Sequence, residues 1–410
     1  MDAYGADVSR ARRKRVLVLN HFAAPSSAPG GTRHVEMFSR LDNWDAVILA
    51  ANRNVISQQI VRERGDFYRT VWTTPVSRRG VSRVINWISF AITSFVRGLR
   101  VGRVDVVYGS SPHLLAPLSA YAIAKVRRAP FVLEVRDLWP QILTEMGGMS
   151  ETSVVYRMLS TLENFLYRRA DAIVVMALGV EREMHRRGHG DKVRYIPNSA
   201  DPEDMAAPSP RSELRNRFDF TALTGVYAGA HGQANGLDLL IQAVHDAGFR
   251  TDQLQIVLVG DGSEKPKLRQ LAVDLALTAG TIRFLDPIAK TEIPALLGAA
   301  DFGVHVLADV NLFRSGVSPN KLFDYMAAGL PALTNTGGDT GRLVSDNDAG
   351  IAVAPDDLAA GLRAMIAASD EQRAVWGAHG LRYMHDHQSR TAMALRLSEL
   401  LDEVSSRDDG

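Results

Sequence analysis

The chain contains no cysteine among its 410 residues. This absence excludes disulfide bonds, thiolate nucleophiles and cysteine-ligated metal sites, and it suits the reducing environment of a cytoplasm. The chain also lacks a marked excess of either charge, because 47 Lys and Arg face 46 Asp and Glu and leave a formal net charge of +1. Any site for an anionic partner must therefore be local, and the composition gives no drive toward nucleic acid.

Long hydrophobic runs are absent as well. The longest apolar region, residues 84–96, reads VINWISFAITSFV and is interrupted by polar residues, so it falls short of the roughly 20 apolar residues that span a bilayer. The VLVL run after the polar and basic residues 1–14 is too short for the core of a signal peptide. We therefore expect a cytoplasmic protein, either free or peripheral on the inner face of the cell membrane.

Residues 78–103 nevertheless carry an apolar stripe at helical spacing. Its members are Val81, Val84, Ile85, Ile88, Ala91, Ile92, Phe95 and Leu99. One interpretation is a helix that packs this stripe against a sheet. The other is a helix that lies on an anionic membrane surface, which would suit the arginines at both ends and the aromatic residues Trp87 and Phe90 outside the stripe. The sequence leaves both interpretations open.

The composition is that of an ordinary globular protein, with 46% hydrophobic and 23% charged residues, and the length favours two domains. Short apolar runs alternate with helical patterns, and most runs are continuously apolar, which is typical of parallel strands buried on both faces. The runs are RVLVLNHF, DAVILAANR, VDVVYGSS, PFVLEVRD, DAIVVMA and VRYIPN, then TGVYAGA, LQIVLVGDG, TIRFLD, FGVHVL, PALTN and GIAVAP. We predict an α/β protein of two doubly wound, Rossmann-like domains facing a cleft, with ligands at the carboxyl ends of the strands.

Proline, serine and aspartate accumulate between the two sets of runs, as expected for an interdomain connection. The predicted parts of the chain are a basic tail (1–14), an N-terminal domain (15–200), a linker (201–222), a C-terminal domain (223–388) and a final helix (389–410).

Glycine-rich turns join several predicted strands to predicted helices. Gly30 and Gly31 precede a helix that begins near Thr32, where free backbone N–H groups and the helix dipole favour an anion, although a simple reversing turn explains the pair about as well. The corresponding turns of the second domain contain Gly229, Gly232, Gly236, Gly260 and Gly262. They would admit a ligand close to the backbone or serve only tight packing. The Walker spacing and a complete dinucleotide fingerprint are missing, so neither a P-loop nor NAD binding is supported.

The segment FRSGVSPNKLFDYMAAGLP in the second domain combines small residues, two cations and a carboxylate. We predict that a helix begins near Pro319 with Ser318 as its N-cap. Arg314 and Lys321 would then flank the helix amino terminus, where a diphosphate is readily held, and Asp324 could accept hydrogen bonds from ribose hydroxyls. The pattern predicts a nucleoside-diphosphate site. The alternative is an ordinary helix start with a surface arginine and an acid placed for the helix dipole.

Together with this segment, HFAAPSSAPGGTRHVEMF, VDVVYGSSPHLLAPLSAYAIAK, PFVLEVRDLWP, YAGAHGQANGLDLLIQA and LVGDGSEKPKL resemble the GT-B glycosyltransferases of family four. The similarity runs from about Arg15 to the final helix and is greatest to the branch that builds bacterial O-antigens and capsules, which includes N-acetylfucosamine transferases. The resemblance implies a GT-B fold in which the N-terminal domain binds the acceptor, the C-terminal domain binds the donor, and the last helix crosses back. It also implies a retaining, metal-independent transfer from a nucleoside-diphosphate sugar, with a UDP-sugar favoured.

The chain departs from the family pattern at the donor site. Family members usually carry two glutamates separated by seven residues; the second falls at Asp324, which would hold the ribose, and the first falls at Gly316, which has no side chain. The usual arginine and lysine after the first donor-domain strand are also missing, which leaves Arg314 and Lys321 to stabilise the departing diphosphate. The contacts to the sugar hydroxyls that this glutamate normally makes would come from backbone amides of residues 315–318 or from elsewhere in the chain. The further donor candidates are Val317, Ser318, Asn320, Ile288, Gly229, Gly232, Gly260 and Gly262.

The resemblance also points to residues on the acceptor side. Asp137, in RDLWP at a strand end, is where this branch keeps a candidate catalytic acid or base, and Arg136 lies beside it. An N-cap or a salt bridge to Arg136 would explain Asp137 nearly as well. The other acceptor candidates are Gly30, Gly31, His34 and His113, although lone histidines are more often structural.

No metal site is predicted. The tripeptide DND at residues 346–348 lies in a polar loop, and HDH at residues 385–387 lacks the spacing for one metal face. No cofactor is expected beyond the nucleotide-sugar co-substrate.

The sequence thus predicts a hexosyltransferase that moves an N-acetylated hexosamine to a polyprenyl-diphosphate-linked glycan in cell-surface polysaccharide assembly. Three alternatives remain: a glycosyltransferase with a soluble natural-product acceptor, a GT-B-like sugar-nucleotide epimerase, and a non-catalytic nucleotide-sugar binder.

Overall fold

The computed structural model describes residues 13–25, 31–54, 59–76, 80–145, 148–277, 280–310, 313 and 317–406. Contacts group them into two compact units. One unit holds the described residues up to Glu134, residues 166–172 and the chain from Ala394 onward, and the other holds residues 135–165 and 173–393. This grouping differs from the predicted domains in residues 135–165 and 173–200, and the domain boundaries stay a prediction.

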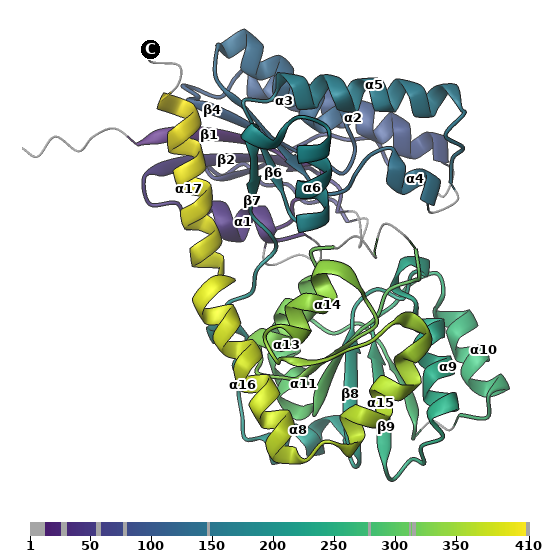
Figure 1. The fold of residues 1–410 in the computed structure, drawn as a ribbon. Helices are drawn as coiled ribbons and strands as arrows, with labels where there is room; N and C mark the ends of the chain where they lie inside the picture. The colour runs from purple at the N-terminus through teal and green to yellow at the C-terminus, as the bar shows by residue number, and fades with distance from the viewer. Residues whose placement is uncertain are drawn as a thin grey trace, which may run out of the picture. The chain divides into compact units, whose positions relative to one another are not determined.

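The first sheet has seven strands in the order β3-β2-β1-β4-β5-β6-β7 (Figure 1). They are β1 (Lys14–Leu19), β2 (Trp44–Ala51), β3 (Tyr68–Val71), β4 (Val106–Ser110), β5 (Phe131–Val135), β6 (Ala172–Val175) and β7 (Val193–Tyr195). The neighbouring strands pair in parallel, for example β1 with both β2 and β4. Every residue of β4 and β5 is buried, as the continuous apolar runs predict. The sequence analysis missed only β3, which has four residues and a half-buried middle.

The helices that accompany this sheet follow its strands along the chain, as in a doubly wound fold. They are α1 (Arg33–Phe38), α2 (Gly80–Gly98), α3 (Leu115–Arg127), α4 (Gln141–Glu145), α5 (Val154–Arg169), α6 (Leu178–Arg186) and the 3-10 helix η1 (Gly190–Lys192). The final helix, α17 (Arg390–Ser406), contributes to the same unit through Asp402, whose Oδ1 accepts a hydrogen bond from Nε1 of Trp44 at 3.2 Å.

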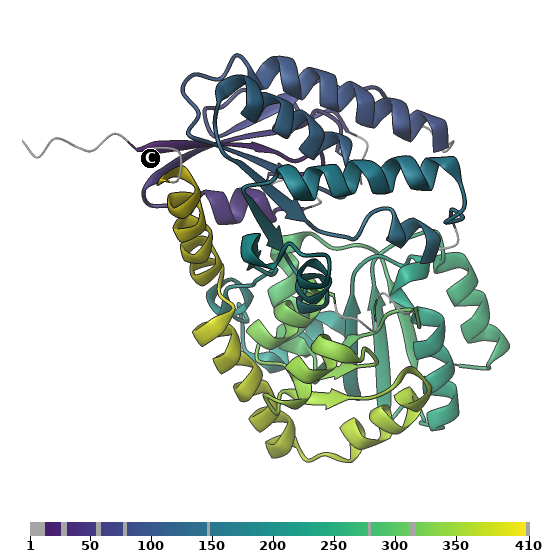
Figure 2. The same ribbon diagram turned by 45° about the horizontal axis from the view of Figure 1, so that its top comes forward.

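The second sheet has six strands in the order β10-β9-β8-β11-β12-β13, and their registers are parallel. They are β8 (Leu223–Ala228), β9 (Leu254–Val259), β10 (Ile282–Leu285), β11 (Phe302–His305), β12 (Ala332–Thr334) and β13 (Gly350–Ala352). The accompanying helices are α7 (Pro202–Met205), α8 (Arg211–Phe218), η2 (Gln233–Asn235), α9 (Leu237–Ala247), α10 (Lys265–Asp274), η3 (Lys290–Glu292), α11 (Ile293–Ala299), α13 (Asn320–Ala327), α14 (Gly338–Ser345), η4 (Pro355–Asp357), α15 (Leu358–Ala367) and α16 (Asp370–His387). Figure 2 shows the same elements from a second direction.

Alternate residues of β9 contribute to two different apolar clusters, one on each face of the second sheet. Val257 and Val259 belong to the cluster that contains α11 and α13. Ile256 and Leu258 belong to the cluster that contains α9, α10 and α15. A strand buried on both faces explains its continuous apolar sequence. The structure therefore confirms the predicted fold class, two parallel sheets with helices on their faces.

Helix α2 exposes most of the apolar stripe of residues 78–103. One interpretation of the sequence is that this stripe packs against the sheet. Val81, Val84, Ile85, Ile88 and Ile92 are exposed, whereas the buried residues of the helix are Asn86, Ser89, Phe90, Ser94 and Gly98. The stripe therefore does not pack against the sheet, and that interpretation is wrong. Among the described residues, no helix combines the length and the apolar character needed to cross a bilayer.

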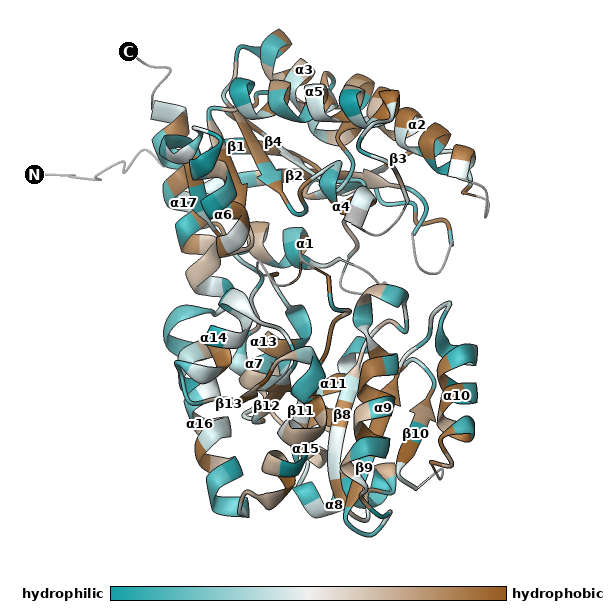
Figure 3. Ribbon diagram, turned by 45° about the vertical axis from the view of Figure 1, so that its right-hand side comes forward, coloured by the Kyte–Doolittle hydropathy of each residue, from teal (hydrophilic) through white to brown (hydrophobic). Residues whose placement is uncertain are grey.

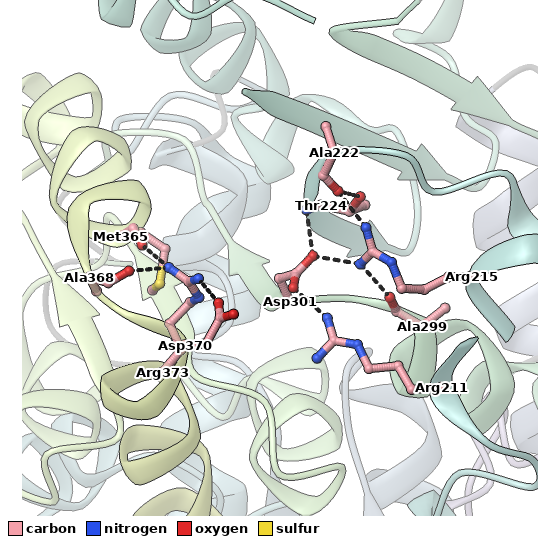
Figure 4. Close-up of polar contacts among 10 residues, drawn as sticks. All are labelled: Arg211, Arg215, Ala222, Thr224, Ala299, Asp301, Met365, Ala368, Asp370 and Arg373. Atoms are coloured by element: carbon pink, nitrogen blue, oxygen red, sulfur yellow. Dashed lines mark hydrogen bonds and ion pairs between the residues drawn. The ribbon is translucent and has the colours of Figure 1, made fainter. Parts of the chain in front are cut away.

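A half-buried carboxylate, that of Asp301, joins three elements next to β8 and β11. Asp301 accepts hydrogen bonds from the Thr224 N–H at 2.7 Å, from Nη1 of Arg215 at 2.8 Å and from Arg211 (Figure 4). Arg215 also donates to the carbonyl oxygens of residues 222 and 299. This network holds α8 against the amino ends of β8 and β11. Figure 4 also shows Arg373, whose guanidinium donates hydrogen bonds to the carbonyl oxygens of residues 365 and 368 at the carboxyl end of α15.

We predict that Asp301→Ala lowers the free energy of unfolding by about 2–3 kcal/mol, because the Arg215 guanidinium loses its carboxylate partner and the Thr224 N–H loses its acceptor. The measurement is the urea midpoint followed by circular dichroism. Asp252→Ala is the matched control, since Asp252 pairs with Arg250 on the surface, where both side chains are at least 60% exposed, and it should leave the midpoint nearly unchanged. Equal losses in the two variants would show that the Asp301 network is not structural.

Candidate functional site

The loops that follow β8 and β9 lie directly against each other. The Gly229 N–H donates to the Val259 carbonyl at 2.9 Å, and the His231 N–H donates to the Asp261 carbonyl at 2.9 Å. A Cβ at Gly260, where φ is +145°, would fall 1.9 Å from the Gly229 oxygen. A Cβ at Gly262 would fall 2.3 Å from the His231 oxygen. Close approach of the two loops therefore explains Gly260 and Gly262, and ligand contact with either stays a prediction.

Gly229 makes room for the side chain of Lys321. A Cβ at Gly229 would lie 2.1 Å from Cε of Lys321, so any larger residue would displace the lysine. The Lys321 ammonium lies 3.3 Å from Oδ1 of Asn235 and 5.0 Å from the centre of the Tyr227 ring. The structure thus brings together β8, its following loop and the first turn of α13. The sequence analysis identified Gly229 and Lys321 separately but did not place them in contact.

The Lys321 ammonium is poorly compensated. Among the residues that the structure describes, it makes one hydrogen bond, the long one to Asn235, although an ammonium can donate three. Burial lowers the pKa of Lys321 to about 8, and the nearby Asp324 carboxylate opposes this shift. A half-buried cation with donors to spare, at the start of a helix, is suited to an anion such as a diphosphate.

The start of α13 differs from the prediction by one residue. The helix begins at Asn320, with Pro319 in the N-cap position and no side-chain cap. Ser318 does not cap the helix, because its Oγ accepts a hydrogen bond from the Asn198 N–H at 2.9 Å while its carbonyl accepts one from Nδ2 of Asn198 at 2.9 Å. Ser318 is therefore held from outside the helix, and the residue after it supplies the extended backbone that precedes the first turn.

The remaining predicted donor residues lie around this helix start or outside the described part. The Val317 N–H donates to Oγ1 of Thr340 at 3.5 Å, and the Thr340 hydroxyl donates to the Val317 carbonyl at 3.3 Å. Asn320 is exposed, and Asp324 is half-buried one turn further along. Arg314 and Gly316 lie outside the described residues, so the question of what replaces the missing glutamate stays open. Nothing in the described geometry assigns a contact to Gly232 beyond its carbonyl, which accepts the Asn235 N–H at 3.0 Å.

Two buried side chains near this loop pair were not singled out from the sequence. His231 is fully buried, and neither ring nitrogen has a hydrogen-bond partner among the described residues. Burial, helped by the cation of Lys265, lowers the pKa of His231 to about 4, so the imidazole is neutral near pH 7. Nζ of Lys265 donates to the Gly260 carbonyl at 2.7 Å and to the Leu285 carbonyl at 3.0 Å. This lysine therefore ties the loops after β9 and β10, near the half-buried Ile288.

Asp137 and Arg136 follow β5 in a bend, and both are half-buried. Burial raises the pKa of the Asp137 carboxyl, although the Arg136 charge opposes the shift. The next helix, α4, begins at Gln141, so Asp137 is not its N-cap. A carboxyl with a raised pKa can hold and release a proton closer to neutral pH. This property agrees with an acid or base but does not establish one.

His34 is part of a buried network around Glu134, a residue that the sequence analysis passed over. Nε2 of His34 lies 2.9 Å from Oε1 of Glu134. The Tyr108 hydroxyl donates to Oε2 at 2.6 Å, and the Ser110 hydroxyl donates to Oε1 at 2.8 Å. Glu134 is completely buried at the end of β5, so these partners are what make its burial tolerable. His34 therefore has a structural contact, and its role toward an acceptor stays a prediction.

His113 is buried as well. Its Nε2 lies 2.8 Å from Nδ1 of His21, and its ring stacks on Trp87 with 5.0 Å between centroids. Burial lowers the pKa of His21 to about 3, and burial together with the neighbouring His21 lowers the pKa of His113. Both imidazoles are therefore neutral near pH 7. Gly31 accepts a hydrogen bond from the Ala24 N–H at 3.1 Å, and Gly30 lies outside the described residues.

Within the described ranges, no group of three or more His, Asp or Glu side chains is arranged to hold a metal ion. Metal independence of the reaction stays a prediction.

Comparison with known proteins identifies both halves of the chain. Residues 32–199 match a family model described as a glycosyl transferase 4-like domain, and residues 222–370 match one described as glycosyl transferases group 1. A relative in Pseudomonas aeruginosa, the probable glycosyltransferase WbjE, is 24% identical over 316 residues, which is 74% of each chain.

Solved structures share the fold. HepE of Anabaena, in complex with UDP and glucose, has a TM-score of 0.71 and 17% identity, and the match covers 95% of this chain and 100% of HepE. Sucrose-phosphate synthase of Thermosynechococcus elongatus has a TM-score of 0.75 and 14% identity, with 96% and 100% covered. Both likenesses support the fold, and the two family matches together take in most of the sequence. The chain therefore belongs to the group 1 glycosyltransferases and has the GT-B fold.

Proposed function

We propose that the protein transfers a sugar with retention from a UDP-sugar to a polyprenyl-diphosphate-linked glycan, and that the second sheet binds the donor. The observation that carries this proposal is the half-buried Lys321 ammonium at the start of α13, which makes a single long hydrogen bond to the described residues. HepE, which shares the fold, has been solved with UDP and with UDP-glucose, and this supports a uridine donor. An N-acetylated hexosamine as the sugar, and membership of the N-acetylfucosamine transferase branch, rest on the sequence resemblance.

The reaction needs a group that stabilises the negative charge on the departing diphosphate. As the bond between the sugar C1 and the diphosphate oxygen breaks, negative charge grows on the diphosphate, and the Lys321 ammonium and the N–H groups at the start of α13 would favour that charge. Arg314 is the second candidate cation. Asp324, one turn along α13, would accept hydrogen bonds from the ribose. No step in this scheme requires a metal ion.

The acceptor oxygen forms its bond to C1 on the face that the diphosphate leaves, which gives retention. The acceptor proton ends on a diphosphate oxygen, and a general acid or base on the acceptor side would carry it there. Asp137, whose pKa is raised by burial, is the candidate acid or base on the acceptor side. The same scheme accommodates a soluble acceptor, whereas an epimerase would convert the donor with no acceptor present. Product formation from a UDP-sugar with a lipid-linked acceptor, with a soluble acceptor and with none distinguishes the three.

Lys321→Met tests the donor site. We expect UDP affinity to fall roughly 10- to 100-fold, because a hydrogen bond to a charged group contributes about 1.5–3 kcal/mol. The free variant should be at least as heat-stable as the wild type at pH 7, since the substitution removes a half-buried and poorly paired charge. The measurement is a thermal shift titrated with UDP, in which a ligand at 100 times its dissociation constant stabilises by about 2.7 kcal/mol.

The matched control is Lys267→Met, because Lys267 is an exposed lysine of the same unit that pairs with Glu264 on the surface. It should keep the wild-type response to UDP. Wild-type affinity in Lys321→Met would refute the donor assignment.

Asp137→Asn tests the acceptor side. We expect kcat for sugar transfer to fall roughly 100-fold or more, as for loss of a general acid or base, with little change in KM for the donor. Burial raises the folded pKa of Asp137, so its ionised form costs stability once the pH exceeds the unfolded value, and the neutral amide should raise the melting temperature at pH 7.

Asp66→Asn, at an exposed carboxylate of the first sheet's unit, serves as the control and should change neither quantity. Full activity in Asp137→Asn would remove this residue from the mechanism.

A further inference from the structure

Helix α2 presents a continuous aliphatic surface to solvent. Its exposed members, with Val81 at 71% and Ile92 at 59% exposure, recur at intervals of three and four residues and so share one side of the helix. The full set is Val81, Val84, Ile85, Ile88, Ile92 and Val96. Figure 3 shows the hydrophobic colouring along α2. We call these six residues the α2 face.

The opposite side of α2 is polar, and hydrogen bonds fix it against its own unit. Asn86 Nδ2 donates to the Thr74 carbonyl, and the Ser89 hydroxyl accepts the Thr74 N–H at 3.0 Å. Further along the helix, the Ser94 and Ser119 hydroxyls lie 3.2 Å apart. Rotating the helix to bury the α2 face would break these bonds and leave the Thr74 backbone groups and the Ser119 hydroxyl facing aliphatic side chains, which is costly. The outward orientation is therefore built into the fold.

The aromatic residues of α2 do not belong to this surface. Phe90 is fully buried, with its ring 4.5 Å from that of His21, and Trp87 stacks on His113. A different indole takes the exposed position: Trp72 is 59% exposed, and its carbonyl accepts a hydrogen bond from the Thr93 hydroxyl at 2.8 Å. Trp72 thus lies beside α2, and an indole is suited to the boundary between apolar and aqueous layers.

The charges around the α2 face have one sign. From Gly80 to Arg103 the sequence contains four arginines and no acidic residue. Arg103 pairs with Asp105, whereas Arg83, Arg97 and Arg100 are exposed and form no ion pair with a described residue. An aliphatic face with arginines at both ends complements a surface that is apolar within and negatively charged outside, as an anionic bilayer is.

We propose that the α2 face is a docking surface for an anionic lipid bilayer, with the helix lying in the plane of the headgroups. The charge pattern disfavours a second copy of the chain as the occupant, because a two-fold contact through α2 would bring arginines together with no acid between them. The proposal is independent of the donor site, and it would place the acceptor-binding half of a lipid-dependent transferase at its substrate.

The test is sedimentation of the purified full chain with vesicles, without any nucleotide. We expect binding to phosphatidylglycerol-containing vesicles, weak binding to pure phosphatidylcholine, and loss of binding at high salt. Ile88→Asn combined with Ile92→Asn should lower the partition coefficient by at least about tenfold, because two buried aliphatic contacts are lost. Arg97→Gln and Arg100→Gln should each lower it about fivefold on anionic vesicles.

The control pairs Val273→Asn with Leu395→Asn, two exposed aliphatic residues on other helices, and it should bind vesicles as the wild type does. All variants should melt at the wild-type temperature and keep the UDP response, so that failure here is separable from failure of the donor proposal. No vesicle binding by the wild type, or equal loss in the control, would overturn the proposal. So would a solution dimer that the α2 double variant dissociates, since the face would then belong to a second copy.

Discussion

The proposed donor site is organised around one half-buried ammonium. Lys321 projects from the first turn of α13 across Gly229, over the Tyr227 ring and toward Asn235. Partial burial of a cation that makes one long hydrogen bond to the described residues lowers the stability of the free protein, and the same desolvation lowers the pKa of Lys321 to about 8. Such an arrangement is explained if an anion completes it, because the bound state then supplies the missing acceptors. The proposed diphosphate is that anion.

Several glycine constraints follow from this lysine and from the loops beside it. Gly229 has no Cβ because the Lys321 stem occupies the space, and Gly260 and Gly262 have none because the loop after β8 occupies theirs. The glycines therefore form the walls of the candidate site without themselves showing ligand contact. His231, buried between these loops with no hydrogen-bond partner among the described residues, is held neutral by burial and the surrounding cations.

The fold could be predicted from the sequence because parallel strands buried on both faces, such as β5 and β9, leave continuous apolar runs. Strand β3 escaped because its four residues are only half apolar. The candidate site was predicted in part. Lys321 and Asp324 follow from the pattern of a helix start, but the contact between Lys321 and Gly229 joins residues far apart in the chain, and no local pattern encodes it. The α2 face shows the opposite limit. Helical spacing identified the stripe, whereas the side of the helix that faces inward depends on hydrogen bonds with Thr74 and Ser119, which no local pattern encodes.

The central claim is that Lys321 is kept as a half-buried cation for a diphosphate. The most direct measurement is the titration of this lysine by NMR. In protein labelled with 13C-lysine, Lys321→Met identifies the signal by its loss. The account predicts a pKa of about 8 in the free protein and a higher value with UDP bound, because a nearby anion favours the charged form. A pKa near the ordinary lysine value in the free protein, or no change when UDP binds, would contradict it.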